Sequence, residues 1–230
     1  MRFIIAFLFC FTTFITGNAQ GENVELIYVM DPQCSWCYAN SGNIEEIQEA
    51  VKDSMTIDFK AAGMWLDQEA PQGGASFFQR VTQHVPAMLS KTGARVGTAY
   101  YDLASDASYT FSSLEPSAAI VLVKKMAPEK TIEFAKMIER ALFDQGKRLD
   151  EIATYKKILN ELAIDSDSFE QNWMSEDNLK ETRSEFEKSK KLVTNFPTLV
   201  IRRGTKTEIL GVGYFTKEQI LPKIDAFLAE

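Results

Sequence analysis

Cys34-Ser35-Trp36-Cys37 follows a mostly apolar run, Val24 to Met30, from which only Asp31-Pro32-Gln33 separates it. The run is rich in β-branched and aromatic residues, as in a buried strand, and its end coincides with a proline. From Ser35 to Val51 apolar residues recur at spacings of three and four, which predicts a helix. The two thiols therefore lie one helical turn apart at a strand-to-helix junction. At that spacing one sulfur can attack a disulfide and the other can attack the resulting mixed disulfide.

A structural disulfide and a zinc site are the other uses of such a pair. A bridge from Cys34 to Cys37 closes a very small loop, and because chain-entropy stabilisation grows with loop length, it would stabilise little. A structural zinc site needs about four Cys or His ligands. Once the predicted signal peptide is cleaved and Cys10 is lost with it, the chain offers only this pair and the single histidine His84, with Asp31 as a recruited ligand. We therefore expect no metal and no organic cofactor, only a redox-active Cys34–Cys37 disulfide.

The N-terminus is typical of a secretory signal peptide. Residues 3–14 are nearly all apolar, and Gly17-Asn18-Ala19 ends in small residues, which predicts cleavage after Ala19. An uncleaved anchor is the alternative, although an apolar core of roughly 12 residues falls short of the ~20 that a membrane span needs. A lipoprotein signal is disfavoured by the bulky Phe9 before Cys10. We expect an exported protein, periplasmic or secreted, with no stable membrane insertion. It would keep an even pair of thiols, which suits an oxidising compartment.

The charge of the chain bears on its partners. The 230 residues carry a formal net charge of −7, with 45% hydrophobic residues. A nucleic-acid partner requires a basic face, so the charge argues against one. The composition is that of an ordinary soluble globular protein.

Two separate parts of the chain show strand patterns. Near the start, residues 24–30 and 55–62 flank the predicted helix, and a right-handed crossover would make these two strands parallel. Near the end, residues 198–202 and 207–210 predict a β-hairpin, and Thr216 is a plausible cap for a final helix.

The middle of the chain predicts helices alone. Pro116 suits the first turn of one helix, and Ser168 with Gln171 resembles a capping box before a charged helix. Phe77 and Phe78 are expected in the core of this block. The predicted fold class is α/β, in four segments: a signal peptide, a β-α-β part, an all-α insertion and a β-β-α part. Their bounds are residues 1–19, 20–66, 67–190 and 191–230.

This order, the cysteine pair at the first strand–helix junction, and Phe196-Pro197-Thr198 before the third strand together resemble the thioredoxin fold. The helical block makes the chain similar to the DsbA family. Within that family, Asp31 to Tyr38 resembles the FrnE-like branch, whose members are sometimes described as predicted disulfide isomerases. The resemblance covers essentially the whole chain after the signal peptide.

The resemblance implies that Cys34 is an exposed nucleophile, Cys37 a partly buried resolving thiol, and Pro197 a cis-proline opposite them. A helix N-terminus would independently favour a thiolate at Cys34. DsbA enzymes usually hold Pro-His between the cysteines, and the histidine helps to stabilise the thiolate. Ser35-Trp36 supplies no cation at this place, so we expect a less oxidising couple.

A client peptide would lie along the proline loop as an added strand, which places Phe196 and Thr198 in the substrate-binding site. Trp36 and Tyr38 would line the same groove, with Trp65 as a further candidate. Core packing is the alternative for Tyr38 and Trp65, since aromatic side chains are usually packed.

Other titratable residues are weaker candidates. His84 is far in sequence from both motifs, so we expect a surface or packing role. Lys60, Asp31 and Glu46 could assist proton transfer, although most such charges are simply solvated.

We therefore expect an exported thiol–disulfide oxidoreductase that forms or exchanges disulfides in client proteins through a mixed disulfide. Its partners would be those clients and an unidentified redox partner. An isomerase usually gains from dimerisation, and only residues 20–23 precede the first strand, which favours a monomeric oxidase or general oxidoreductase. Two alternatives stay open: a glutathione-dependent isomerase or transferase of the kappa or hydroxychromene-carboxylate type, and a non-catalytic peptide-binding chaperone. The former tends to carry serine in place of Cys34.

Overall fold

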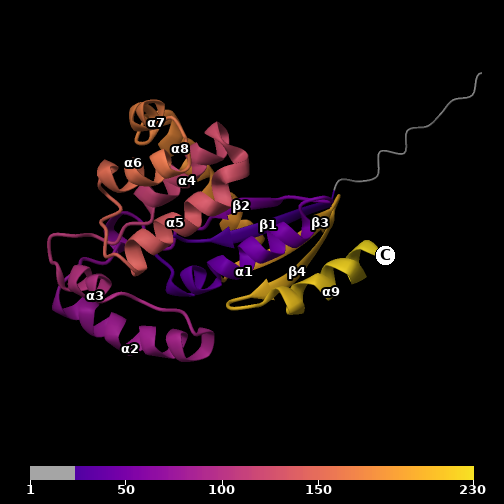
Figure 1. The fold of residues 1–230 in the computed structure, drawn as a ribbon, viewed down its shortest axis with the longest axis horizontal. Helices are drawn as coiled ribbons and strands as arrows, with labels where there is room; N and C mark the ends of the chain where they lie inside the picture. Colours follow the sequence, from indigo (N-terminus) through magenta and orange to yellow (C-terminus); the bar gives the residue numbers. More distant parts are fainter. Residues whose placement is uncertain (1–23) are drawn as a thin grey trace, which may run out of the picture.

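The computed structural model describes residues 24–230, in which a mixed sheet carries helices on both faces and a helical block lies beyond one end (Figure 1). The strands are β1 (Val24–Met30), β2 (Ile57–Ala61), β3 (Thr198–Arg203) and β4 (Lys206–Val212). The α-helices are α1 (Ser35–Val51), α2 (Ala75–Thr92), α3 (Thr98–Ser105), α4 (Leu114–Met126), α5 (Thr131–Phe143), α6 (Ile152–Glu161), α7 (Ser166–Asn172), α8 (Glu176–Leu192) and α9 (Lys217–Leu228). Short 3-10 helices are η1 (Asp67–Glu69) and η2 (Pro128–Lys130).

The strand order in the sheet is β2-β1-β3-β4. β1 runs parallel to β2, with Leu26 opposite Ile57, and antiparallel to β3, with Leu26 opposite Ile201. β3 and β4 form the expected antiparallel hairpin. Because η1 to α8 all lie between β2 and β3 in the chain, the predicted α/β fold interrupted by a helical insertion is confirmed.

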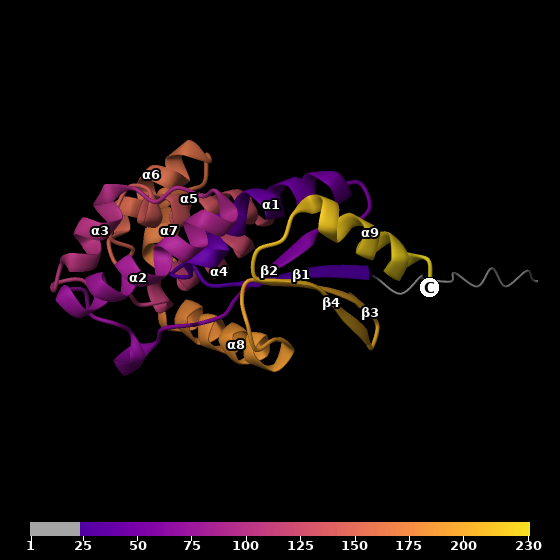
Figure 2. The ribbon, with the colours of Figure 1, turned by 90° about the horizontal axis from the view of Figure 1, so that it is seen from below.

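Alternation along β1 divides the core between the two sheet faces. Leu26 and Tyr28 belong to the large cluster that includes residues of α1 and α9, whereas Ile27 and Val29 pack with residues of α8 and β3. Figure 2 shows α1 and α9 above the sheet and α8 below it. In β2, Lys60 lies on the α8 side, where its Nζ is 2.8 Å from Asp58 and 3.8 Å from Glu185. A residue on that face is separated by the sheet from α1, so Lys60 is not placed to assist the thiols.

Two details of the helical block differ from the sequence prediction. The charged helix does not begin near Ser168: Ser168 lies inside the short helix α7, which the Asp165 side chain caps. The charged helix is α8, and the Ser175 side chain caps it by accepting from the backbone N–H of Asn178. Several Ser and Asp side chains in this stretch can cap a helix, so the spacing of Ser168 and Gln171 alone identified the wrong residue. Phe77 is buried, but Phe78 is 38% exposed, because neighbouring helical residues point to different faces.

The capping prediction near the C-terminus is confirmed, since Thr216 and Gln219 form a capping box at α9. The predicted signal peptide lies outside the described residues, and its cleavage after Ala19 stays a prediction. Within residues 24–230, every helix is too short or too polar to cross a membrane.

Candidate active site

Cys34 lies immediately before the first residue of α1 and occupies the N-cap position of that helix. The turn from β1 is held by a hydrogen bond from Cys34 N–H to the Asp31 carbonyl at 3.0 Å. The Cys34 carbonyl accepts from Tyr38 N–H at 3.1 Å and so closes the first helical turn. Unpaired N–H groups and the positive end of the helix dipole favour an anion at this position. The Cys34 side chain therefore lies at the positive end of α1.

Both thiols are reduced, and they differ in burial. Cys34 retains 8% of its surface, so the expectation of an exposed nucleophile is wrong: the Phe196 carbonyl lies 4.0 Å from its Sγ, and the pocket described below surrounds its other side. Cys37 is fully buried rather than partly buried, and its Sγ accepts from Asp31 N–H at 3.5 Å. Burial raises the pKa of Cys37, and a hydrogen bond with Cys34 raises it further. Of the two sulfurs, only that of Cys34 borders the pocket.

The loop opposite the thiols contains the cis Phe196–Pro197 peptide bond. The Pro197 carbonyl accepts from Gly213 N–H at 2.8 Å, which ties the loop to the end of β4. Thr198 is buried, and its hydroxyl donates to the Asn195 carbonyl at 2.6 Å. Thr198 also pairs with both neighbouring strands. Its side chain thus supports the loop from within, and Phe196 is the residue of this loop next to Cys34.

A pocket of about 250 Å³ opens beside Cys34. Its walls are mainly apolar and come from α1, α2 and the loop after β2: Trp36, Met64, Trp65, Phe77, Val81 and Val85. Trp36 and Trp65 therefore line this pocket, and Trp65 also packs edge-on against Phe77 with ring centroids 5.7 Å apart. Tyr38 does not line this pocket, because it stacks on Phe143 with ring centroids 4.9 Å apart and donates to the Arg95 carbonyl at 2.6 Å.

Sequence reasoning missed the contribution of α2 to this pocket. Arg80 and His84 both border it, although His84 was expected to have only a surface or packing role. The sequence spacing of Arg80 and His84 from the cysteines does not indicate that they border the Cys34 pocket, because this depends on how α2 packs beside α1. The amphipathic pattern of α2 could have identified its buried face, but not what that face would meet.

Asp31, a candidate for proton transfer, is instead held as a structural carboxylate. It is fully buried; its Oδ1 accepts from Gln33 N–H and from the Ser113 hydroxyl, each at 2.9 Å. Its Oδ2 accepts from Met64 N–H at 2.7 Å. Burial raises the pKa of Asp31, while these hydrogen bonds oppose the shift. The carboxylate joins the turn before Cys34 to the loop after β2 and to the start of α4.

Replacing Asp31 with alanine is expected to lower the free energy of unfolding by about 3 kcal/mol or more. Three buried donors would lose their acceptor, and an unsatisfied buried donor costs about 1–3 kcal/mol. Guanidinium unfolding of the reduced protein measures the loss. Ser113→Ala removes a single partner, so it should cost only about 1 kcal/mol. Equal losses of unfolding free energy in the two variants would contradict the role of Asp31 as the acceptor that joins these three segments.

A family model described as a DSBA-like thioredoxin domain matches residues 25–215. The chain belongs to the DSBA-like thioredoxin domain family. Members of this family are generally thiol–disulfide oxidoreductases, and the predicted resemblance to the DsbA family is confirmed. The comparison with curated proteins found no match.

Solved structures share the fold of this DSBA-like protein. A proposed protein disulfide isomerase from Nitrosomonas europaea is 22% identical, with a TM-score of 0.79 over 90% of this chain and 98% of that chain. The cytosolic disulfide reductase DsbM from Pseudomonas aeruginosa, solved with GSH, is 22% identical, with a TM-score of 0.72 over 90% and 100%. A 2-hydroxychromene-2-carboxylate isomerase is 11% identical, with a TM-score of 0.54 over 89% and 95%. At these identities the likeness shows the fold alone.

The DSBA-like protein has a second buried carboxyl that the sequence did not reveal. Glu139 of α5 is 1% exposed, and its Oε1 has no hydrogen-bond partner among residues 24–230. It borders a cavity of about 10 Å³, roughly the space of one water, together with Tyr28, Ser41 and Lys136. Burial raises the pKa of Glu139, and the nearby charges of Cys34 and Asp31 raise it further. Its own charge adds to the raised pKa of Cys37.

Glu46, the remaining candidate for proton transfer, lies at the surface. The Glu46 side chain is 59% exposed and lies 3.4 Å from Lys217. It is therefore a solvated ion pair on α1, not a group beside the thiols.

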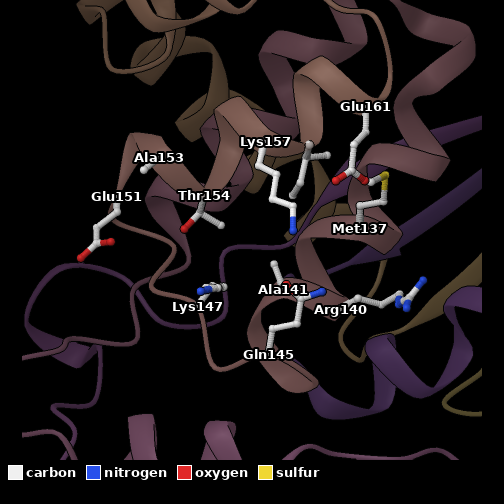
Figure 3. A pocket seen from close by; sticks show the side chains of 11 residues that line it. Met137, Arg140, Ala141, Gln145, Lys147, Glu151, Ala153, Thr154, Lys157 and Glu161 are labelled. Carbon is white, nitrogen blue, oxygen red and sulfur yellow. The ribbon is translucent and has the colours of Figure 1, made fainter.

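A larger hollow of about 410 Å³ lies between α5 and α6. Figure 3 shows basic and acidic side chains mixed around it, including Arg140, Lys147 and Lys157 with Glu151 and Glu161. No thiol lines it, and most of these charged side chains extend from exposed positions. The cysteine pair of the DSBA-like protein therefore lies at the smaller pocket, not at this hollow.

Proposed function

We propose that this protein exchanges disulfides with exported client proteins through Cys34. The observation that carries the proposal is the asymmetry of the thiol pair: Cys34 borders a pocket at a helix N-terminus, whereas Cys37 is buried directly behind it. Such an arrangement lets one sulfur meet a client and reserves the other for the intramolecular step.

The oxidising direction takes two exchanges. A client thiolate attacks Sγ of oxidised Cys34, the Cys34–Cys37 bond breaks, and Cys37 leaves as a thiolate that takes up a proton. A second client thiolate then attacks the client sulfur of the mixed disulfide and expels Cys34 as a thiolate. The client gains a disulfide and loses two electrons, which the cysteine pair holds. No metal or organic cofactor is needed, since sulfur carries the electrons throughout.

We propose net oxidation, or general exchange, by a monomer in an exported compartment. The predicted signal peptide supports the compartment, and the N-terminal sequence of the mature chain tests it. Ser35-Trp36 supplies no cation from between the two cysteines. The Lys91 ammonium lies 5.7 Å from the centroid of the Trp36 ring, so a cation does approach the motif, from α2 instead of from between the cysteines.

The direction is tested by refolding two forms of one disulfide-containing client, fully reduced and scrambled, in glutathione buffers of known potential. We expect faster native disulfide formation from the reduced client, by at least about tenfold over buffer, and little gain with the scrambled client. The Cys34–Cys37 potential measured in the same buffers should be less oxidising than that of DsbA. Strong activity on the scrambled client alone would instead assign an isomerase, and protection without any thiol dependence would assign a chaperone.

A further inference from the structure

The pocket beside Cys34 joins apolar walls to an uncompensated positive rim. Arg80 and His84 border it, and the Arg80 guanidinium lies 5.9 Å from the centroid of the Phe77 ring. Lys91, on the same helix, lies over Trp36. Neither Arg80 nor Lys91 forms an ion pair with any residue of the described range 24–230. Both cations are therefore free to meet a charge brought by a ligand.

The positive charge of this rim contrasts with the net negative charge of the whole chain. The whole sequence has a net charge of −7, yet between Glu69 and Asp102 it contains no acidic residue and carries Arg80, Lys91 and Arg95. Two of the acids that flank this segment already have partners: Asp67 pairs with Arg183 at 2.8 Å, and Asp106 with Arg148 at 3.6 Å. An anionic group at this rim would thus gain attraction without displacing an existing pair.

We propose that the pocket selects client segments in which the reactive cysteine is flanked by a large apolar residue and an acidic residue. The apolar side chain would occupy the space between Trp36, Trp65 and Phe77, and the carboxylate would meet Arg80, His84 or Lys91. This inference rests on the proposed function, because it assumes that Cys34 reacts with peptide thiols. Glutathione also carries negative charge, but it has no large apolar side chain to fill the space between the aromatic walls.

The apolar walls and the cations at the rim would contribute differently to binding. The walls are apolar and partly buried, so desolvation of an aromatic or aliphatic side chain supplies affinity but little orientation. The cations lie at the solvent edge, where screened attraction mainly directs encounter and register. A carboxylate at the edge and a ring inside would fix the peptide with its sulfur beside Cys34.

The test compares three synthetic cysteine peptides of equal length, with Phe and Asp, Phe and Lys, or Gly and Asp next to the cysteine, and glutathione as a fourth thiol. Stopped-flow measurements follow their reaction with the oxidised full-length mature protein. At low salt we expect the Phe/Asp peptide to react about tenfold faster than either other peptide and than glutathione. The advantage over Phe/Lys should shrink as salt is raised.

The double variant R80E/K91E should abolish or invert the preference for Phe/Asp over Phe/Lys. K147E/K157E changes the net charge by the same amount in the hollow of Figure 3, away from the thiols, and should keep the wild-type ratio. Taking the ratio of two peptides within each variant removes any general change in Cys34 reactivity. The ratio also removes any difference in folding yield between the variants.

Three results would overturn the inference. Equal rates for the acidic and basic peptides in the wild-type protein would exclude charge selection. The same loss of preference in K147E/K157E would assign the effect to overall charge and not to this rim. Glutathione reacting as fast as the Phe/Asp peptide would assign the site to a small anionic thiol. If no peptide reacts with Cys34 at all, the proposed function itself fails, which is distinct from reaction without preference.

Discussion

Cys37→Ala is expected to trap a client protein on Cys34 as a stable mixed disulfide. In the reduced protein, the Cys34 thiolate attacks a client disulfide, forms the mixed disulfide and releases one client thiolate. Cys37 would then attack the Cys34 sulfur and release the second client thiolate. Groups held in one molecule reach effective concentrations of about 10⁵–10⁸ M, so loss of Cys37 should slow release by at least about 10³-fold. Non-reducing electrophoresis and mass spectrometry of the intact complex measure the trapped species.

The matched control is Cys34→Ser, which keeps Cys37 and removes the sulfur at the pocket. Cys37 is fully buried, and burial raises its pKa, so it should not replace Cys34 as the nucleophile. We expect no mixed disulfide and a loss of exchange activity of at least about 10³-fold. Trapping by the Cys34→Ser variant, or rapid release from Cys37→Ala, would contradict the roles assigned to the two thiols.

Glu139→Gln is expected to flatten the pH dependence of stability. Because the pKa of Glu139 is raised in the folded protein, the unfolded chain ionises first as pH rises. Its favourable contribution is complete below the ordinary pKa of glutamate, about 4.3, and is lost as pH rises towards the folded value. In that window the free energy of unfolding falls by up to about 1.4 kcal/mol per pH unit from this group.

Urea unfolding of the reduced protein at several pH values between 4 and 8 provides the measurement. The comparison uses the slope against pH, because a buried glutamine also lacks a partner and shifts absolute stability. Glu133→Gln, an exposed position on the same helix, should keep the wild-type slope. Asp31 contributes a slope of the same sign in all three proteins, so it cancels. A Glu139→Gln slope equal to that of the wild type would show that Glu139 does not carry this effect.

Local sequence sufficed where the determining interactions are short in range. The strand before the cysteines and the helix after them were predicted within one residue, since alternation and helical spacing are properties of neighbouring residues. The prediction of Ser168 as a helix cap is wrong, because its spacing from Gln171 does not show which side chain meets the first free N–H groups of the helix. Several side chains near a helix start can cap it, and only the folded backbone selects one.

The sequence by itself determined the local arrangement of the thiols: a strand, a turn and a cysteine pair one helical turn apart. Spacing within one element sets which residues share a face, so these features needed no tertiary information. Only the tertiary structure decided what surrounds the thiols. It placed α2 with Arg80 and His84 beside Cys34, turned Tyr38 towards α5, and buried Glu139 without a partner. These contacts join residues distant in sequence and depend on how helices pack, which no local pattern specifies.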